Sequence, residues 1–397
     1  MGEIVTAFGV CHSPHLLTRP PDEILEQSEA SIAAMRELGK LLDETKPDVI
    51  LFLGSDHLET FSMSCIPTFA IIAGDRVVAE HAGFRYDLPN NREMAEDLLE
   101  KLIHAGFQIA YSQDALLGHT FATPFEYVLE DRKIPVVPFF TNVYLPPLPT
   151  MRNCADLGRE IAKIIKDRPE RVAVIASGGM SHYPGTSKYP DPEYEFDYWM
   201  IGELERGNIE AVLSLTPTQL DETGNTEMLN WAIMFGMIGS APGELIQYTP
   251  TWHHGHGYMR FLPVRERQKP MMERRVMYGG FEFTNQGYKF YKPPSAEAAR
   301  LNKLLYDARL SPSLVERIVT DLDQVAKDYG LSSKERKIAQ NLVDVGKTEG
   351  KVSDYVPPFV EFGVHPLMAL MGIHATYPAA KKAAQEREAL EHQGQKK

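Results

Sequence analysis

Short apolar runs alternate with amphipathic stretches over about the first 280 of the chain's 397 residues, and this pattern restricts the fold most. The apolar runs have the length of buried strands, and the stretches between them place apolar residues at helical spacing. This alternation predicts an α/β fold, with a mostly parallel central sheet flanked by helices. The expected strands span residues 4–10, 48–53, 68–73, 135–140 and 171–176, and the expected helices span residues 21–45, 92–104 and 154–167.

A change in composition near residue 288 predicts a second domain. Before it, residues 197–236 are expected to be mainly helical, and residues 248–287, rich in Tyr, Phe, His and Gly, to form a loop or an edge strand. Beyond an expected linker (YKPPS, 291–295), only helical patterns follow, with Ser313 and Ser332 as expected N-caps and Gly330 as an expected C-cap. These helices are expected over 301–310, 313–329, 332–349 and 359–373.

The domain organisation follows from these patterns. We expect an α/β domain over residues 1–285, a small all-helical domain over residues 296–380, and a flexible, charged tail over residues 381–397.

Charge and cysteine usage exclude several classes of protein. The chain carries 41 Lys and Arg against 54 Asp and Glu, a formal net charge of −13, which argues against a nucleic-acid binder or an anionic-membrane binder. Its three cysteines, Cys11, Cys65 and Cys154, are far apart, as in reduced intracellular proteins. The first residues do not resemble a signal peptide, and no apolar run is long enough to span a membrane. We therefore expect a cytoplasmic protein without a membrane partner.

Histidines follow three of the expected strands at the point where each strand ends. His12 follows the first strand, His57 the second and His182 the last, while His119 follows a short apolar stretch that ends at Gly118. In an open parallel sheet, ligands bind beyond the carboxyl ends of the strands. A structural role is common for any single histidine, but the shared placement favours a common function.

Several neutral imidazoles at one sheet edge indicate a metal site. Imidazole suits Fe, Zn, Cu or Ni, whereas Mg²⁺ and Ca²⁺ need mostly carboxylates, and the scarcity of cysteine disfavours a structural zinc or iron–sulfur site. Two histidines and one carboxylate would leave open positions on the metal, which is the arrangement of non-haem Fe(II) oxygenases. The remaining two histidines would be free for acid–base catalysis.

Glu227 is the candidate carboxylate ligand. It lies in the first turn of an expected apolar helix over 226–237, with Thr226 or Asn225 as the expected N-cap, where an unpaired carboxylate is costly. A favourable interaction with the helix dipole is the alternative explanation. Asp56, next to His57, is the competing candidate.

Five short motifs occur in a fixed order around these residues. The set resembles the class III extradiol dioxygenases, typified by the β subunit of protocatechuate 4,5-dioxygenase, over residues 1 to about 265. The helical region, with the sequence VHPLM over 364–368, is similar to the small α subunit of that family, and the fusion of both parts resembles the gallate dioxygenase arrangement. The motifs are GVCHSP (9–14), SDH (55–57), GH (118–119), GGMSH (178–182) and TE (226–227).

The resemblance implies a ring-cleaving enzyme of aromatic-compound catabolism. It implies Fe(II) held by His12, His57 and Glu227, with His182 as the main acid–base residue and His119 as a second one. A catecholic or hydroxypyridone substrate would bind through two vicinal oxygens, and both atoms of O2 would enter the ring as it opens beside them. The helical domain would act as a lid, and the protein would be a homodimer.

The residues that bind the ring substituent do not follow from the motifs. Candidates are Ser13, His256 and Tyr258, of which the last two belong to the cluster WHHGHGY over 252–258; the same cluster could instead support the metal ligands or form an exposed loop. Arg19 and Arg85 could face an anionic substituent or be plain loop residues. His253, His254 and His365 have open roles, and gallate, protocatechuate, other catechols and hydroxypyridones all remain as substrates.

Two other functions use the same residues. A zinc-dependent hydrolase would use the His and Glu ligands to activate water. A non-catalytic binding protein would keep only the scaffold; the presence of both His119 and His182 beside a full ligand set argues against it.

Overall fold

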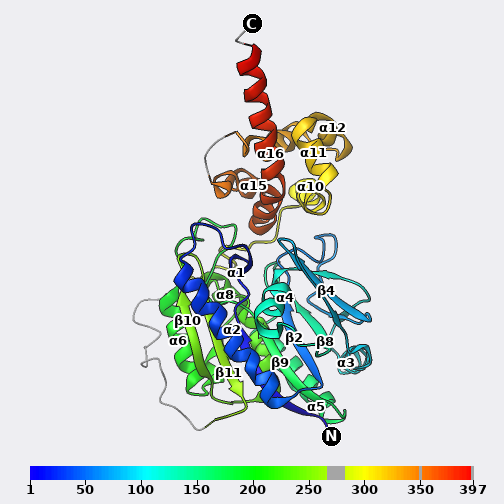
Figure 1. Cartoon of the computed structure of the whole chain (residues 1–397), viewed down its shortest axis with the longest axis vertical. Coiled ribbons are helices and arrows are strands. Elements are labelled where there is room, and N and C mark those ends of the chain that lie inside the picture. The colour runs from blue at the N-terminus through cyan, green and yellow to red at the C-terminus, as the bar shows by residue number, and fades with distance from the viewer. Residues whose placement is uncertain (266–281, 348–350, 395–397) are drawn as a thin grey trace. The chain divides into compact units, whose positions relative to one another are not determined.

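The computed structural model describes residues 1–265, 282–347 and 351–394 (Figure 1). It divides the chain into two compact units, which are described separately below. The first unit comprises Met1–Phe61, Ile66–Tyr183 and Lys188–Phe290, and the second comprises Ser62–Cys65, Pro184–Ser187 and Tyr291–Lys397.

An eight-stranded mixed sheet forms the centre of the first unit, in the order β10-β11-β1-β9-β2-β8-β3-β6. Its middle strands run parallel: β1 (Glu3–Val10), β9 (Arg171–Ser177), β2 (Val49–Ser55) and β8 (Val136–Thr141). These strands are buried on both faces, which explains why their sequences are continuous apolar runs. The expected α/β fold with a mostly parallel central sheet is confirmed.

Antiparallel pairs join the middle of this sheet to the strands on either side. On one side, β11 (Gly255–Leu262) pairs antiparallel with β1 and with β10 (Glu244–Pro250). On the other, β3 (Phe69–Ile72) pairs antiparallel with β8 and parallel with β6 (Ile109–Ser112). The expectation of a loop or edge strand over 248–287 is therefore met in part by β10 and β11, and residues 266–281 of that range lie outside the described residues.

A small second sheet in the order β5-β4-β7 was not expected from the sequence. Its strands are β4 (Arg76–His81), β5 (Phe84–Pro89) and β7 (Leu116–Leu117). The first unit also contains α1 (His15–Thr18), α2 (Leu25–Thr45), α3 (Arg92–His104), α4 (His119–Pro124), a π-helix (Phe125–Leu129), α5 (Met151–Lys166), α6 (Tyr194–Glu205), α7 (Ile209–Leu213), α8 (Pro217–Thr223) and α9 (Met228–Ile238).

Helix α9 packs closely against the sheet because Gly9 lacks a side chain. A Cβ atom on Gly9 would lie 2.2 Å from the Trp231 ring, so only glycine lets this part of α9 approach β1. The expected N-cap of this helix is wrong: α9 begins at Met228, and Glu227, not Thr226 or Asn225, occupies the N-cap position. The Glu227 side chain is directed to other partners, described below.

The second unit is helical, as expected for the C-terminal region. The expected helix over 313–329 is wrong as a single element, because Asp321 ends α11 and its side chain accepts a hydrogen bond from the Gln324 N–H at the start of α12. The N-cap of α11 is Ser311 rather than Ser313, because Pro312 occupies the first helical position. The helices are α10 (Ala299–Leu310), α11 (Pro312–Thr320), α12 (Leu322–Asp328), α13 (Ser333–Ala339), α14 (Asn341–Asp344), α15 (Pro357–Phe362) and α16 (Pro366–Gly394), with short 3₁₀ turns at Ala296–Ala298 and Val352–Tyr355.

Local capping signals account for the other helix ends of this unit. Ser332 caps α13 with a capping box to Glu335, as expected. Gly330, with φ 63°, follows the C-cap residue of α12, and Gly363, with φ 101°, ends α15 and so divides the expected helix over 359–373. The expected helix over 332–349 is likewise divided into α13 and α14, and 348–350 lie outside the described residues. Helix α16 continues to Gly394, through most of the segment expected to be a flexible tail.

Among the described residues, none of the helices combines the length and the apolar character needed to cross a bilayer.

Candidate metal centre

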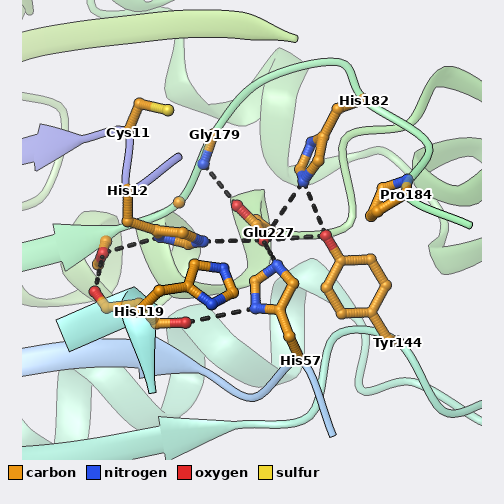
Figure 2. Close-up of polar contacts among 12 residues, drawn as sticks. Cys11, His12, His57, His119, Tyr144, Gly179, His182, Pro184 and Glu227 are labelled. Atoms are coloured by element: carbon orange, nitrogen blue, oxygen red, sulfur yellow. Dashed lines mark hydrogen bonds and ion pairs between the residues drawn. The ribbon is translucent and has the colours of Figure 1, made fainter. Parts of the chain in front are cut away.

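Two histidines and one glutamate from distant parts of the sequence meet at the carboxyl ends of the parallel strands. His12 follows β1, His57 follows β2, and Glu227 directly precedes α9. Oε1 of Glu227 lies 3.1 Å from Nε2 of His12 and 3.0 Å from Nε2 of His57 (Figure 2). All three side chains are almost completely buried. The structure thus brings these three sequence candidates together on a single carboxylate oxygen.

The hydrogen bonds of His12 determine which of its nitrogens faces Glu227 as an acceptor. The Ser177 hydroxyl donates to the Thr120 carbonyl at 2.9 Å, so it can only accept from Nδ1 of His12, which lies 2.9 Å away. The proton of a neutral His12 is therefore on Nδ1, and the Nε2 lone pair faces the carboxylate. A lone pair and a carboxylate oxygen 3.1 Å apart are stable only when a cation lies between or beside them.

The chemistry of these groups fits a metal ion. Burial lowers the pKa of His12 and of His57, despite the neighbouring Glu227 carboxylate, and so favours the neutral imidazoles that bind metals. Burial alone would raise the pKa of Glu227, but positive charge at the neighbouring His12 and His182 would hold that pKa well below the ordinary value. Its second oxygen, Oε2, accepts a hydrogen bond of 2.5 Å from the Gly179 N–H, which fixes the carboxylate.

A family profile described as the catalytic LigB subunit of aromatic ring-opening dioxygenase matches residues 6–258. The chain belongs to this family. The matched range includes all five metal and acid–base candidates, His12, His57, His119, His182 and Glu227.

The LigB-family chain is similar to curated proteins named 2,3-dihydroxyphenylpropionate/2,3-dihydroxicinnamic acid 1,2-dioxygenase. One from Klebsiella pneumoniae (strain 342) is 28% identical over 166 residues, which is 42% of this chain and 52% of the relative. One from Escherichia coli O139:H28 (strain E24377A / ETEC) is 29% identical over 175 residues, 44% of this chain and 55% of the relative. The match thus spans about half the length of these curated relatives. A solved structure, of the uncharacterized protein JW3007 from Escherichia coli K12, is 14% identical and covers 65% of this chain and 99% of its own, with a TM-score of 0.47.

His182 lies beside the three candidate ligands. Its Nδ1 lies 2.7 Å from the Met180 carbonyl, which can only accept, so Nδ1 carries the proton and Nε2 faces the centre. Nε2 lies 3.6 Å from Oε1 of Glu227 and 2.8 Å from the Tyr144 hydroxyl. The ring of His182 also stacks on His254, with 3.8 Å between ring centroids and an interplanar angle of 11°. Its orientation is therefore determined from three sides.

Tyr144 lies next to this candidate centre, and the sequence interpretation missed it. It lies in the loop after β8, is buried, and donates a hydrogen bond of 3.0 Å to Oε1 of Glu227. Its hydroxyl thus connects Glu227 with His182 (Figure 2). A single tyrosine in a Pro-rich loop carries no sequence signal that would have indicated this contact.

His119 begins α4 and lies next to two of the candidate ligands. Its ring centroid is 4.3 Å from that of His57 and 5.5 Å from that of His12. Its Nδ1 donates to Oε2 of Glu59 at 2.9 Å, so Nε2 is the nitrogen available for acid–base work. Burial, opposed in part by Glu59, lowers the pKa of His119 to about 4. Glu59 was also missed; it fits because Gly118 has no Cβ, which would lie 1.7 Å from Oε2 of Glu59.

Asp56, the competing candidate for the carboxylate ligand, binds backbone N–H groups. It accepts hydrogen bonds from the N–H groups of Glu59, Thr60 and Phe61, at 2.7, 2.9 and 3.1 Å. Burial raises the pKa of Asp56 to about 6, and these three donors oppose the rise. Asp56 therefore stabilises the loop that carries His57.

The candidates for contact with a ring substituent lie in different surroundings. Ser13 follows His12 and is fully buried, and its hydroxyl has no hydrogen-bond partner in the described part of the chain. His256 and Tyr258 lie on β11; Nδ1 of His256 is 3.0 Å from the Ser31 hydroxyl, and Tyr258 belongs to the hydrophobic core. Arg19 and Arg85 form exposed ion pairs with the acidic residues Glu29 and Glu80.

The remaining histidines of interest also have partners. His15 and His253 both contact Oε1 of Glu23, each at 2.8 Å, and His81 lies 3.6 Å from Glu59. His365, in the second unit, stacks on Tyr291.

Proposed function

We propose that this protein is a non-haem Fe(II)-dependent extradiol dioxygenase, which inserts both atoms of O2 into a catecholic or hydroxypyridone ring and opens it beside the vicinal oxygens. The observation that carries this proposal is the convergence of His12 Nε2 and His57 Nε2 on one buried oxygen of Glu227, in a chain of the LigB family. Two imidazoles and one carboxylate form the ligand set that leaves positions open on Fe(II).

His12, His57 and Glu227 would hold the ferrous ion. When bound, the ion would supply a redox-active centre that lowers the pKa of the diol and brings it together with O2. The protein's own contribution is to fix the ligands: Ser177 holds the His12 ring through Nδ1, and the Gly179 N–H holds the second oxygen of Glu227.

His182 is the proposed acid–base residue. Because Nδ1 is committed to the Met180 carbonyl, Nε2 is free to take a proton from a ring hydroxyl and later to return one. The Tyr144 hydroxyl has one proton, which it donates to Glu227, so its oxygen, 2.8 Å from Nε2 of His182, would accept a hydrogen bond from Nε2 once His182 has taken up a proton. His119, oriented by Glu59, is the proposed second acid–base residue.

The family and the relatives, whose names specify dihydroxylated aromatic acids, support the proposed substrate class. Of the three candidates for the ring substituent, we retain Ser13, because its buried hydroxyl directly follows a proposed ligand and has no partner within the described residues. Gallate, protocatechuate and hydroxypyridones stay within the class to be tested.

We further propose that the helical region over 296–380 is the counterpart of the small α subunit, fused as in the gallate dioxygenase arrangement, and that the protein is a cytoplasmic homodimer. The purified chain alone should then be active, without a second protein, and should have the mass of two chains by light scattering. A requirement for a separate subunit would contradict the fused arrangement, and a monomeric mass would contradict the dimer.

Oxygen uptake tests the function directly. The protein is loaded anaerobically with Fe(II) and mixed with catechol, protocatechuate, gallate, 2,3-dihydroxyphenylpropionate or a dihydroxypyridine. We expect equimolar consumption of O2 and diol with at least one of these, and none with 1,4-hydroquinone, whose hydroxyls are not vicinal. An absence of uptake with every diol would contradict the proposal, and O2-independent hydrolysis by the zinc-loaded protein would favour the hydrolase instead.

A further inference from the structure

A second group of side chains that could hold a metal includes Cys11, the neighbour of His12 in the chain. Cys11 directly follows β1, His254 directly precedes β11, and His256 lies within β11. Cys11 Sγ and one nitrogen from each histidine lie within 4.8 Å of one another, and all three residues are buried. We propose that Cys11, His254 and His256 bind a second metal ion, Zn²⁺.

The spacing of the donor atoms suits such an ion. Cys11 Sγ lies 3.8 Å from Nε2 of His254. With Zn–S bonds of about 2.3 Å and Zn–N bonds of about 2.0 Å, two ligands of a tetrahedral zinc are separated by roughly 3.5 Å. A sulfur–nitrogen contact of 3.8 Å is a weak hydrogen bond, but a small side-chain movement would make it an edge of a zinc tetrahedron.

An orphaned nitrogen also points to a ligand. His256 is bound through Nδ1 to the Ser31 hydroxyl at 3.0 Å, so Nε2 is the atom left to face the cluster. This buried Nε2 has no hydrogen-bond partner in the described structure. Buried polar atoms without partners are rare and costly. A metal ion would satisfy Nε2.

The backbone keeps space for this group and holds it rigidly. A Cβ atom on Gly179 would lie 1.8 Å from Nε2 of His254, so the glycine is what admits that ring. The backbones of His182 and His254 form a β-bridge, and the Gly255 N–H donates to the Ser181 carbonyl at 2.9 Å. His254 is thus held before any metal binds, which lowers the entropic cost of binding.

The donor set also distinguishes this site from the first one. One thiolate and two imidazoles favour Zn²⁺ and its substitute Co²⁺, whereas the proposed iron ligands are nitrogen and oxygen atoms. On binding, the metal–sulfur bond forms as the Cys11 S–H bond breaks, and the proton leaves to solvent. Since His254 stacks on His182, the bound ion would also fix the position of His182.

Cobalt spectroscopy tests the proposal on the full-length protein. Under reducing, anaerobic conditions, Co²⁺ should bind at about two ions per chain and produce a thiolate-to-cobalt charge-transfer band in the near ultraviolet. Cys11→Ser should remove the band and one of the two ions. Cys65→Ser and Cys154→Ser, which change the other two cysteines, should keep both.

Two results would overturn the second site. One is a single bound ion without a thiolate band in the unmodified protein, and the other is a band that survives Cys11→Ser. If circular dichroism shows that Cys11→Ser does not fold, His256→Gln tests the site instead. This variant keeps all cysteines and should weaken cobalt binding at this site at least tenfold. The band depends on neither O2 nor a diol, so its absence would leave the proposed dioxygenase function unaffected.

Discussion

Nε2 of His12 and Oε1 of Glu227 lie 3.1 Å apart although 215 positions separate the two residues in the chain. The Ser177 and Thr120 hydrogen bonds place the proton of His12 on the opposite nitrogen, so the contact joins a lone pair to a carboxylate. A metal ion bound to both atoms would stabilise this contact, as would a second proton on His12, whose pKa burial lowers.

Glu227→Gln should weaken Fe(II) binding by about 100-fold or more. Mutating a residue that only hydrogen-bonds a metal ligand typically weakens binding by about 10–100-fold. The amide preserves the shape of the side chain but removes the charge that His12 and His57 share. Competition with a coloured iron chelator measures the affinity. Glu203→Gln, a change at a buried glutamate of α6 that pairs with Arg206, is the matched control and should bind iron normally. Equal affinities of the two variants would remove Glu227 from the ligand set.

Ser177→Ala should lower iron affinity by roughly 10–100-fold, because His12 loses the acceptor that fixes its ring and its tautomer. Ser28→Ala is the control, because Ser28 is also a buried serine but lies in α2. It removes a hydroxyl from the interior and should leave iron affinity unchanged. The same chelator competition applies. A Ser177→Ala protein with unchanged affinity would show that the Nδ1 contact does not orient His12.

His182→Gln should reduce kcat by about 10²–10⁴-fold while the iron content stays the same, since the residue is proposed to move protons rather than to bind metal. Oxygen-uptake kinetics and elemental analysis of one sample separate the two effects. Loss of iron in parallel with loss of turnover would assign His182 to the metal instead.

Tyr144→Phe should lower kcat about tenfold, which corresponds to one hydrogen bond of about 1.4 kcal/mol, and should alter the pH dependence of kcat. The ring remains to fill its place, but Nε2 of His182 loses its 2.8 Å partner. Tyr127→Phe, which removes a buried hydroxyl bound to the Leu16 carbonyl, is the control. A pH profile identical to that of the unmodified protein would exclude the positioning role of Tyr144.

Asp197 should make the unfolding free energy depend on pH. Burial raises the pKa of Asp197 to about 7, although Tyr248, Asn225 and the Ser181 N–H donate to it. Between the ordinary value of 3.8 and about 7 the folded state therefore binds more protons than the unfolded state, and stability falls as pH rises through this range, by up to about 4 kcal/mol.

Urea unfolding between pH 5 and about 8 checks this, with Asp197→Asn as the comparison. The difference in unfolding free energy between the two proteins should change steadily with pH. Parallel profiles would mean that Asp197 ionises equally in both states.

The sequence was most informative where burial leaves a periodic pattern. Strands β2 and β8 are buried on both faces, so their apolar runs stood out and the mostly parallel sheet could be predicted. The helix breaks at Asp321 and Gly363 were missed, because apolar periodicity continues across them while the capping groups act through single side chains or a single positive φ. The second sheet was missed since its edge strands, such as β5, are largely exposed and polar.

The candidate site shows the same division. Histidines at strand ends were recognisable because topology brings strand ends to one edge, and Glu227 was recognisable as a charge beside an apolar helix. Tyr144 and Glu59 were not, since each lies in a loop whose path alone decides where the side chain points. His256 was singled out as a contact for the ring, which stays a prediction, and its neighbours include Ser31, Cys11 and His254.

The complete burial of Glu227 has a consequence for the life of the protein in a cell. A buried carboxylate destabilises the folded state unless a cation lies beside it. The iron-free protein would therefore have a lower free energy of unfolding, which iron binding would raise. The iron-free form would open more often and be degraded sooner, which would match the abundance of the protein to the supply of the metal.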